Sequence, residues 1–173
     1  MLVCRLGIAL AVYVGVSACA QAATCPTANE VRSETKRVGP KATLDAAYAD
    51  TKRWNCVLEG IESTSPSWLS IASSLRSASD AGASSELGVA LVNAFEKNPS
   101  AVLAVTPKEA APGKLSVQTV CNPAIEPPQG YRAFFDQIEV KLVALKAESL
   151  GVKKERCLDI VRRARLALVG ASK

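Results

Sequence analysis

The chain has 173 residues and no histidine, so the commonest catalytic base is missing. A Ser-His-Asp or Cys-His arrangement needs an imidazole to take the proton of the nucleophile. No G-x-S-x-G, P-loop or G-x-G-x-x-G segment occurs, which removes the nucleophile elbow and the glycine-rich phosphate cradles. The sequence therefore contains no catalytic motif, and we expect a protein that is not an enzyme and uses no cofactor.

Aromatic residues are also scarce, at 5% of the chain, whereas apolar residues make up 49%. Leu, Ala, Val and Ile must therefore fill most of the core, and these small side chains suit closely packed helices. No clear period-two alternation and no Asn-Gly or Asp-Gly hairpin signal occurs in residues 23–173. We expect a single all-α domain over these residues, with six to eight helices in an irregular bundle or a short HEAT-like array.

Charge is nearly absent from the first 29 residues, where Arg5 is the one charged side chain. The apolar run 6–16 is too short to span a bilayer as a helix. It is followed by Ala20-Gln21-Ala22, the A-x-A pattern that signal peptidase recognises. Residues 1–22 are therefore predicted to be a secretory signal, with cleavage before Ala23.

A second processing route competes with this one. Val16-Ser17-Ala18-Cys19 resembles the bacterial lipoprotein box, in which the cysteine is lipidated and becomes the new N-terminus. Valine fits the first position of that box less well than leucine, so both routes stay open. Either route predicts an exported protein, periplasmic or associated with the outer envelope.

Four of the six cysteines, Cys25, Cys56, Cys121 and Cys157, lie in the predicted mature chain. An even number of cysteines in an oxidising compartment indicates disulfides, and four cysteines allow three pairings. Sequential pairing, Cys25 with Cys56 and Cys121 with Cys157, is favoured because it attaches each end of the domain to a neighbouring helix without crossing the chain. Zinc is disfavoured because the chain has no C-x-x-C and no histidine, so no metal site is predicted.

Helix signals are spread over the whole mature chain. Gly39-Pro40 should stop a weak first helix, and Thr43 should cap a strong second one. Ser65-Pro66 and Asn98-Pro99 are two further starts, because proline suits the first helical position. Gly151 should end the long helix that precedes the last one. The expected helices cover 27–38, about 44–62, 66–77, from 84 or 85 to 97, 99–105, 131–150 and 153–169.

The last of these helices is basic. Residues 141–173 contain nine basic and three acidic residues. The outward positions Lys154, Arg162, Arg163 and Arg165 could meet an acidic protein surface or an anionic envelope component, or form a solvated helix face. Within the helix, only Glu155 and Asp159 are spaced to neutralise them. Because no aromatic residues lie between the basic ones, nucleic-acid binding is not expected. Membrane association through lipidated Cys19 or through this helix stays open.

Two carboxylates and two tryptophans are further candidates. Asp80 and Glu126 could hydrolyse a glycan if they lay at a suitable separation. The alternative is that Asp80 caps a turn through its Ser79-Asp80-Ala81-Gly82 setting, and that Glu126 pairs with a basic helix. Trp54 and Trp68 fall on predicted apolar stripes, so they are expected in the core or between helices and not as a platform for sugar rings.

One stretch of the chain resembles a family of small exported proteobacterial proteins that are all-helical, HEAT-like and without an assigned activity. The resemblance covers about a third of the mature chain and implies a HEAT-like helical domain with no catalytic residues to transfer. In size, export and helical content the chain is also similar to periplasmic immunity proteins of contact-dependent secretion systems, an analogy of architecture alone. The family resemblance is carried by Trp68-Leu69-Ser70-Ile71-Ala72, Ser79-Asp80-Ala81-Gly82-Ala83-Ser84, Asn98-Pro99 and Val102-Leu103.

These observations favour a non-enzymatic, exported protein that binds a protein partner in the envelope. An immunity-type inhibitor of a partner toxin is the most specific form of this hypothesis. An envelope-anchored structural or stress lipoprotein is the first alternative, and a carboxylate-dependent hydrolase is the second.

Overall fold

The computed structural model describes residues 25–107, 115–146 and 148–170, and every regular element in these ranges is a helix. The all-α prediction is therefore confirmed. These ranges contain nine α-helices and one 3₁₀ helix, more than the six to eight expected. The elements are α1 (Ala28–Val38), α2 (Pro40–Tyr48), α3 (Thr51–Glu62), α4 (Pro66–Arg76), α5 (Ala81–Lys97), α6 (Pro99–Val105), α7 (Val117–Cys121), α8 (Gly130–Ala144), η1 (Glu148–Leu150) and α9 (Gly151–Gly170).

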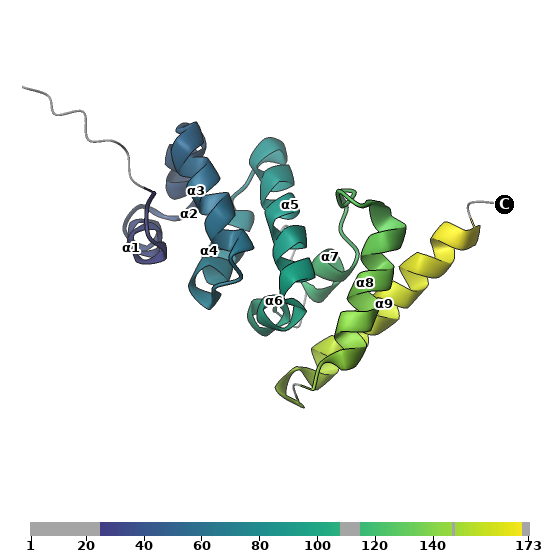
Figure 1. Ribbon diagram of the computed structural model, residues 1–173. Coiled ribbons are helices and arrows are strands. Elements are labelled where there is room, and N and C mark those ends of the chain that lie inside the picture. Colours follow the sequence, from purple (N-terminus) through teal and green to yellow (C-terminus); the bar gives the residue numbers. More distant parts are fainter. Residues whose placement is uncertain (1–24, 108–114, 147, 171–173) are drawn as a thin grey trace, which may run out of the picture.

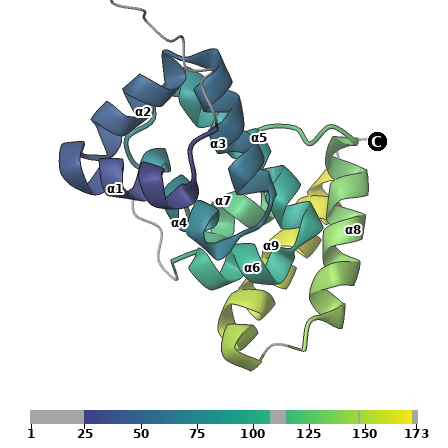
Figure 2. The ribbon, with the colours of Figure 1, turned by 60° about the vertical axis from the view of Figure 1, so that its left-hand side comes forward.

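The helices follow one another along the molecule roughly in sequence order, from α1 at one end to the α8–α9 pair at the other (Figure 1). Packing is mainly between helices that are close in sequence, with α8 against α9 and α3 against α5. Helix α5 is central, because it contacts α3 and α4 on one side and α6, α7 and α8 on the other (Figure 2). Such near-neighbour packing is typical of stacked helical arrays.

The strong helix expected over 44–62 is in fact two helices. Helix α2 ends at Tyr48, and Asp50 caps α3 by accepting hydrogen bonds from the backbone N–H groups of Lys52 and Arg53 at 3.0 and 3.2 Å. Thr43 is not an N-cap. It is buried within α2, and its hydroxyl donates to the Gly39 carbonyl at 2.9 Å. The apolar stripe continues through the break because both helices face the same core, so periodicity alone did not show it.

Two other boundaries also differ from the expectation. Asp80 caps α5 by accepting from the Ala83 N–H at 3.2 Å, so α5 begins earlier than the expected start at Ser84 or Ser85. Gly151 begins α9 and does not end α8, which stops at Ala144. The start expected for α5 was therefore wrong by several residues, whereas Gly151 is a helix boundary, but it begins the following helix.

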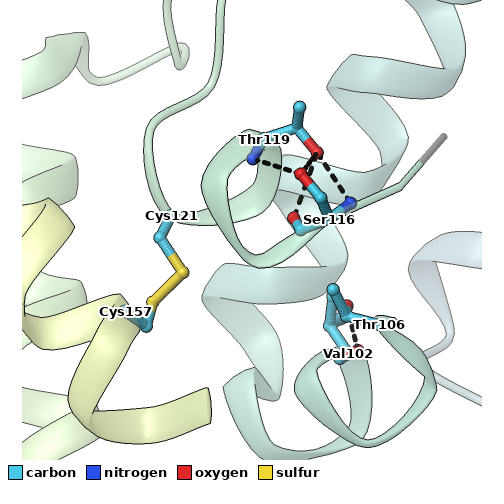
Figure 3. Close-up of a disulfide and its surroundings, with 6 residues drawn as sticks. All are labelled: Val102, Thr106, Ser116, Thr119, Cys121 and Cys157. Carbon is cyan, nitrogen blue, oxygen red and sulfur yellow. Dashed lines mark hydrogen bonds between the residues drawn. A yellow bond between two sulfur atoms is a disulfide. The ribbon is translucent and has the colours of Figure 1, made fainter. Parts of the chain in front are cut away.

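Several local signals act as the sequence indicates. The proline after Ser65 stands at the start of α4, and Asn98 caps α6 by accepting from the Ala101 N–H at 3.1 Å. The segment after residue 114 forms the short helix α7, in which Ser116 and Thr119 cap each other's backbone N–H groups (Figure 3). Thr106-Pro107-Lys108-Glu109 has the form of a capping box, but the turn that it predicts extends outside the described residues.

The buried apolar side chains form one continuous cluster that runs through the stack. Its largest fully buried members are Phe95, Phe134 and Phe135. Trp54 is 3% exposed and belongs to this core, as expected. Trp68 is half-buried and lies on Gly60, where an added Cβ would come within 2.5 Å of the indole. Helices α3 and α4 can therefore approach this closely only because residue 60 has no side chain.

Candidate functional site

The two disulfides join the segments that the sequence pairing predicts. Cys25, just before α1, is bonded to Cys56 of α3, and Cys121 of α7 is bonded to Cys157 of α9 (Figure 3). Two such bonds are typical of proteins that fold in an oxidising, exported compartment. Cys19, the candidate for lipidation, lies outside the described residues.

The four basic residues of the predicted partner-binding face all have partners within the protein. The Arg162 Nε donates to Glu139 Oε1 of α8 at 2.7 Å. Arg165 forms ion pairs with Asp136 Oδ1 at 3.3 Å and with Glu139 Oε2 at 2.7 Å. Within α9, Arg163 pairs with Asp159 at 2.5 Å. The Lys154 Nζ donates to the Leu145 carbonyl at 2.8 Å.

The acids that neutralise Arg162 and Arg165 therefore come from α8 and not from α9. Sequence reasoning considered only acids spaced along the basic helix itself, so it missed Asp136 and Glu139. A signal for them was present, because residues three apart share one face of a helix. A short connection between two long helices also makes them antiparallel neighbours. The three arginines of the basic face are thus paired with carboxylates, whereas Lys154 donates to a backbone carbonyl.

Exposed apolar side chains are concentrated on the same two helices. Of the eight large apolar residues that are exposed in the described ranges, five lie on α8 or α9. Val140 is 70% exposed and Leu166 is 68% exposed. Terminal units of stacked arrays normally have a polar outer face, which keeps the array soluble. The α8–α9 end departs from that rule, since it combines arginine and lysine with Val140, Val143, Val152, Leu166 and Val169.

The structure does not bring Asp80 and Glu126 together as an acid–base pair. Asp80 caps the start of α5, which agrees with the expected capping role and not with the catalytic one. Glu126 is exposed in the proline-rich loop beside Val89, nine residues or about 13 Å further along α5. No ion pair joins Glu126 to the basic helix within the described chain. The closely spaced carboxylates of a glycosidase are therefore not formed by these two residues.

A different pair of carboxylates, missed at the sequence level, lines one open groove between α3, α5 and α8. This groove of about 290 Å³ contains Glu62 and Glu96. Glu62 accepts a hydrogen bond from Asn93 Nδ2 at 2.8 Å and forms an ion pair with Lys97 at 3.6 Å. Burial raises the pKa of Glu96, and the nearby Lys141 offsets part of that effect. The groove therefore contains a carboxyl group, that of Glu96, which ionises less readily than an exposed glutamate does.

This environment predicts the pH dependence of a Glu96→Gln variant. Because the folded-state pKa of Glu96 is raised, the folded chain holds this proton more tightly than the unfolded chain does, and its ionisation destabilises the fold. Glu96→Gln should therefore raise the melting temperature at pH 7 and lose that advantage below the ordinary pKa of a glutamate. Thermal unfolding at pH 7 and pH 3.5 measures this. The exposed Glu59→Gln serves as the control, and equal shifts at both pH values for Glu96→Gln would contradict the assignment.

A second polar cluster supports the core and does not form a ligand site. The Trp54 Nε1 donates to Glu86 Oε2 at 2.5 Å, and the Tyr48 hydroxyl donates to Glu86 Oε1 at 3.3 Å. The negative charge of Glu86, and then its hydrogen bond, raise the pKa of Tyr48. The tryptophan ring is covered, so Trp54 is not available as a stacking surface for a sugar, in agreement with its expected core position.

Two features are absent from the part of the chain that the structure describes. No group of three or more His, Cys, Asp or Glu side chains there is placed to hold a metal ion. Among the helices that the structure describes, none has both the length and the apolar character needed to cross a membrane.

Comparison with known proteins adds no relative to this picture. No protein-family model, no curated protein and no solved structure matches the chain. The resemblance to small exported helical proteins therefore rests on short segments in and around α4, α5 and α6 alone.

Proposed function

We propose that this chain is an exported, non-enzymatic interaction protein that binds a partner protein through the outer surface of α8 and α9. The observation that carries the proposal is the composition of this end of the stack, where exposed valine and leucine side chains lie beside arginines. An immunity-type inhibitor that covers part of a partner toxin is the most specific version. The site of such a protein is a surface and not a pocket, which agrees with the absence of a catalytic motif.

The chemistry of this surface suggests the partner's chemistry. Apolar burial would supply most of the affinity, at roughly 0.8 kcal/mol for each methylene removed from water. An arginine has five N–H donors, so Arg162 and Arg165 keep donors for a partner after pairing with α8 carboxylates. Arginine is among the residues enriched at interfaces. We therefore expect the partner to present an apolar surface with hydrogen-bond acceptors at its rim.

Two double variants test this interface. Val140→Ser/Val143→Ser alters α8, and Leu166→Ser/Val169→Ser alters α9; in each pair the residues are three apart and share a helix face. Each should weaken capture of the partner by about tenfold or more, without loss of stability, because the replaced side chains are exposed in the free protein. The measurement is affinity capture from envelope extracts, followed by titration of the protein captured.

The matched controls separate apolar burial from charge. Val89→Ser changes an exposed valine on α5, away from the proposed interface, and should leave capture unchanged. Arg162→Gln/Arg163→Gln/Arg165→Gln should weaken binding less than the apolar variants do, because these arginines are already paired. If both serine double variants capture the partner as well as the native chain does, the α8–α9 interface is wrong.

The proposal places the protein in the periplasm or on the outer envelope, after export. Its mature N-terminus is expected at Ala23 or, if the chain is processed as a lipoprotein, at a lipidated Cys19. Intact-mass measurement of protein purified from envelope fractions distinguishes these two forms. Recovery of the chain with Met1 still present would contradict export. A lipidated Cys19 would favour the alternative of an envelope-anchored structural or stress lipoprotein.

A second candidate function, a carboxylate-dependent hydrolase, is favoured by one observation. Glu62 and Glu96 line the same groove, and burial raises the pKa of Glu96. A carboxyl group with a raised pKa beside a second carboxylate is the pairing that acid–base hydrolysis uses. Release of soluble fragments from peptidoglycan by the native chain, abolished in Glu96→Gln, would support this candidate over the binding protein.

A further inference from the structure

A separate cavity of about 110 Å³ lies between α5, α7 and the loop that follows α7. Its walls are mostly apolar, and they come from Gly88, Leu91 and Val92 of α5, Val120 of α7, and Ile125 of the loop. For comparison, an engineered apolar cavity of about 150 Å³ is large enough to hold benzene. This cavity has about three quarters of that volume, so it suits an apolar group no larger than one six-membered ring.

One charged side chain, Arg76 at the end of α4, lines this cavity. Its Nη1 donates to the carbonyl and the hydroxyl oxygens of Ser84, which ties the guanidinium to the first turn of α5. Among the described residues, no hydrogen-bond acceptor contacts its other nitrogens, Nε and Nη2, and no carboxylate pairs with Arg76. Burial lowers the pKa of this guanidinium, which nevertheless stays charged at neutral pH.

The free edge of Arg76 determines what can balance its charge. Nε and Nη2 lie on one edge of the planar guanidinium, and this edge binds the two oxygens of a carboxylate in parallel hydrogen bonds. One guanidinium balances one negative charge. A dianion such as a phosphate monoester would leave its second charge against apolar walls, at a large desolvation cost. The polar groups that remain at the cavity, Thr119 and Asn122, are uncharged.

We propose that this cavity is a binding site for a small monocarboxylate that has an apolar body of about one ring or four to five carbons. The carboxylate pairs with the free edge of Arg76, and the apolar body contacts Leu91, Val92 and Val120. The site is independent of the α8–α9 surface, because α4, α5, α7 and the loop form it and neither α8 nor α9 contributes a residue.

The position of Ile125 makes the cavity depend on a glycine. A Cβ added at Gly88 would come within 2.9 Å of Ile125 Cδ1. The loop residue therefore lies directly on the backbone of α5, where it closes one wall. Arg76 is held by Ser84, in the first turn of the same helix, so the charged and the apolar parts of the site are both anchored to α5.

The test uses the full exported chain with both disulfides formed, and benzoate as the probe. Benzoate should bind in isothermal titration calorimetry. Benzamide, which has the same shape and no charge, should bind at least tenfold more weakly, and benzylamine should not bind. Acetate, which lacks the apolar body, should also fail to bind. Equal binding of benzoate and benzamide would overturn the proposal, because the guanidinium would then play no part.

Three variants locate the site. Arg76→Met should weaken benzoate binding about tenfold or more, and Arg76→Lys, which keeps the charge, should restore part of it. Ala124→Phe, at the exposed side of the cavity, should block binding by filling it. Arg32→Met is the matched control, because Arg32 is likewise half-buried and donates to a backbone carbonyl, that of Ser67, outside the cavity. Unchanged binding in Ala124→Phe would overturn the site even if Arg76→Met fails to fold.

One further probe distinguishes a free acid from the end of a peptide chain. N-acetyl-leucine carries the same carboxylate on an apolar stem, together with the amide that a chain terminus would have. It should bind no more tightly than benzoate, because the amide finds no dedicated partner among the apolar walls. Binding about tenfold tighter than benzoate would overturn the assignment to a free acid and assign the cavity to a partner's C-terminus.

Discussion

Replacement of the Cys121–Cys157 disulfide, as Cys121→Ala/Cys157→Ala, should lower the free energy of unfolding by about 4 kcal/mol. The two cysteines are 36 residues apart, and opening a loop of this length restores that much conformational entropy to the unfolded chain. The loss is large against the 5–15 kcal/mol that stabilises a typical domain. Urea unfolding of the double variant and of the native chain, both monitored by circular dichroism, measures the difference.

The other disulfide provides a matched comparison. Cys25 and Cys56 are 31 residues apart, so the entropic term for their loop is almost the same. Burial differs, however, because Cys121 and Cys157 are fully buried whereas Cys25 is exposed. Cys25→Ala/Cys56→Ala should therefore lower the free energy of unfolding by a smaller amount, since it removes less buried sulfur from the core. A cost below about 1 kcal/mol for the Cys121–Cys157 pair would contradict the structural role assigned to it.

A second large effect is expected for Phe95→Ala. Phe95 is fully buried on α5, the helix that contacts both halves of the stack. Replacing a buried phenylalanine by alanine removes apolar burial and leaves a cavity, at a cost of about 3–5 kcal/mol. The loss should appear as a lower denaturation midpoint in urea, with the far-ultraviolet circular dichroism of the folded state unchanged.

Val89→Ala on the same helix is the control for this variant. Val89 is exposed, so its replacement removes little buried area, and alanine is the better helix former. Its free energy of unfolding should stay within about 0.5 kcal/mol of that of the native chain. If Phe95→Ala and Val89→Ala have similar effects, α5 is not the centre of the packed core.

The elements that sequence reasoning located well are those with signals in adjacent residues. Proline after Ser65 and after Asn98 restricts the backbone so that a helix can begin there whatever the tertiary surroundings. The disulfide pairing was also predictable, because sequential loops attach each end of the chain without a crossing. In these cases the physical cause lies within a few residues or in the order of the chain.

The elements that sequence reasoning missed depend on two segments that meet in space. The break between α2 and α3 does not interrupt the apolar stripe. The spacing of the apolar residues therefore gave no sign that Asp50 caps a new helix there. The partners of Arg162 and Arg165 belong to another helix, so charge spacing along α9 could not reveal them. The groove with Glu62 and Glu96 likewise needs α3 and α5 to be placed side by side.

The sequence by itself predicted an all-helical protein, favoured two sequential disulfides over the other pairings, and contains no histidine. Composition, cysteine order and short cap signals are properties of the chain that folding does not change. Only the tertiary structure decided which charges are neutralised, which carboxylates share a groove, and that Arg76 has a free edge at an apolar cavity. Those properties depend on distances between residues far apart in sequence, and packing sets such distances, because burial and desolvation act on neighbours in space.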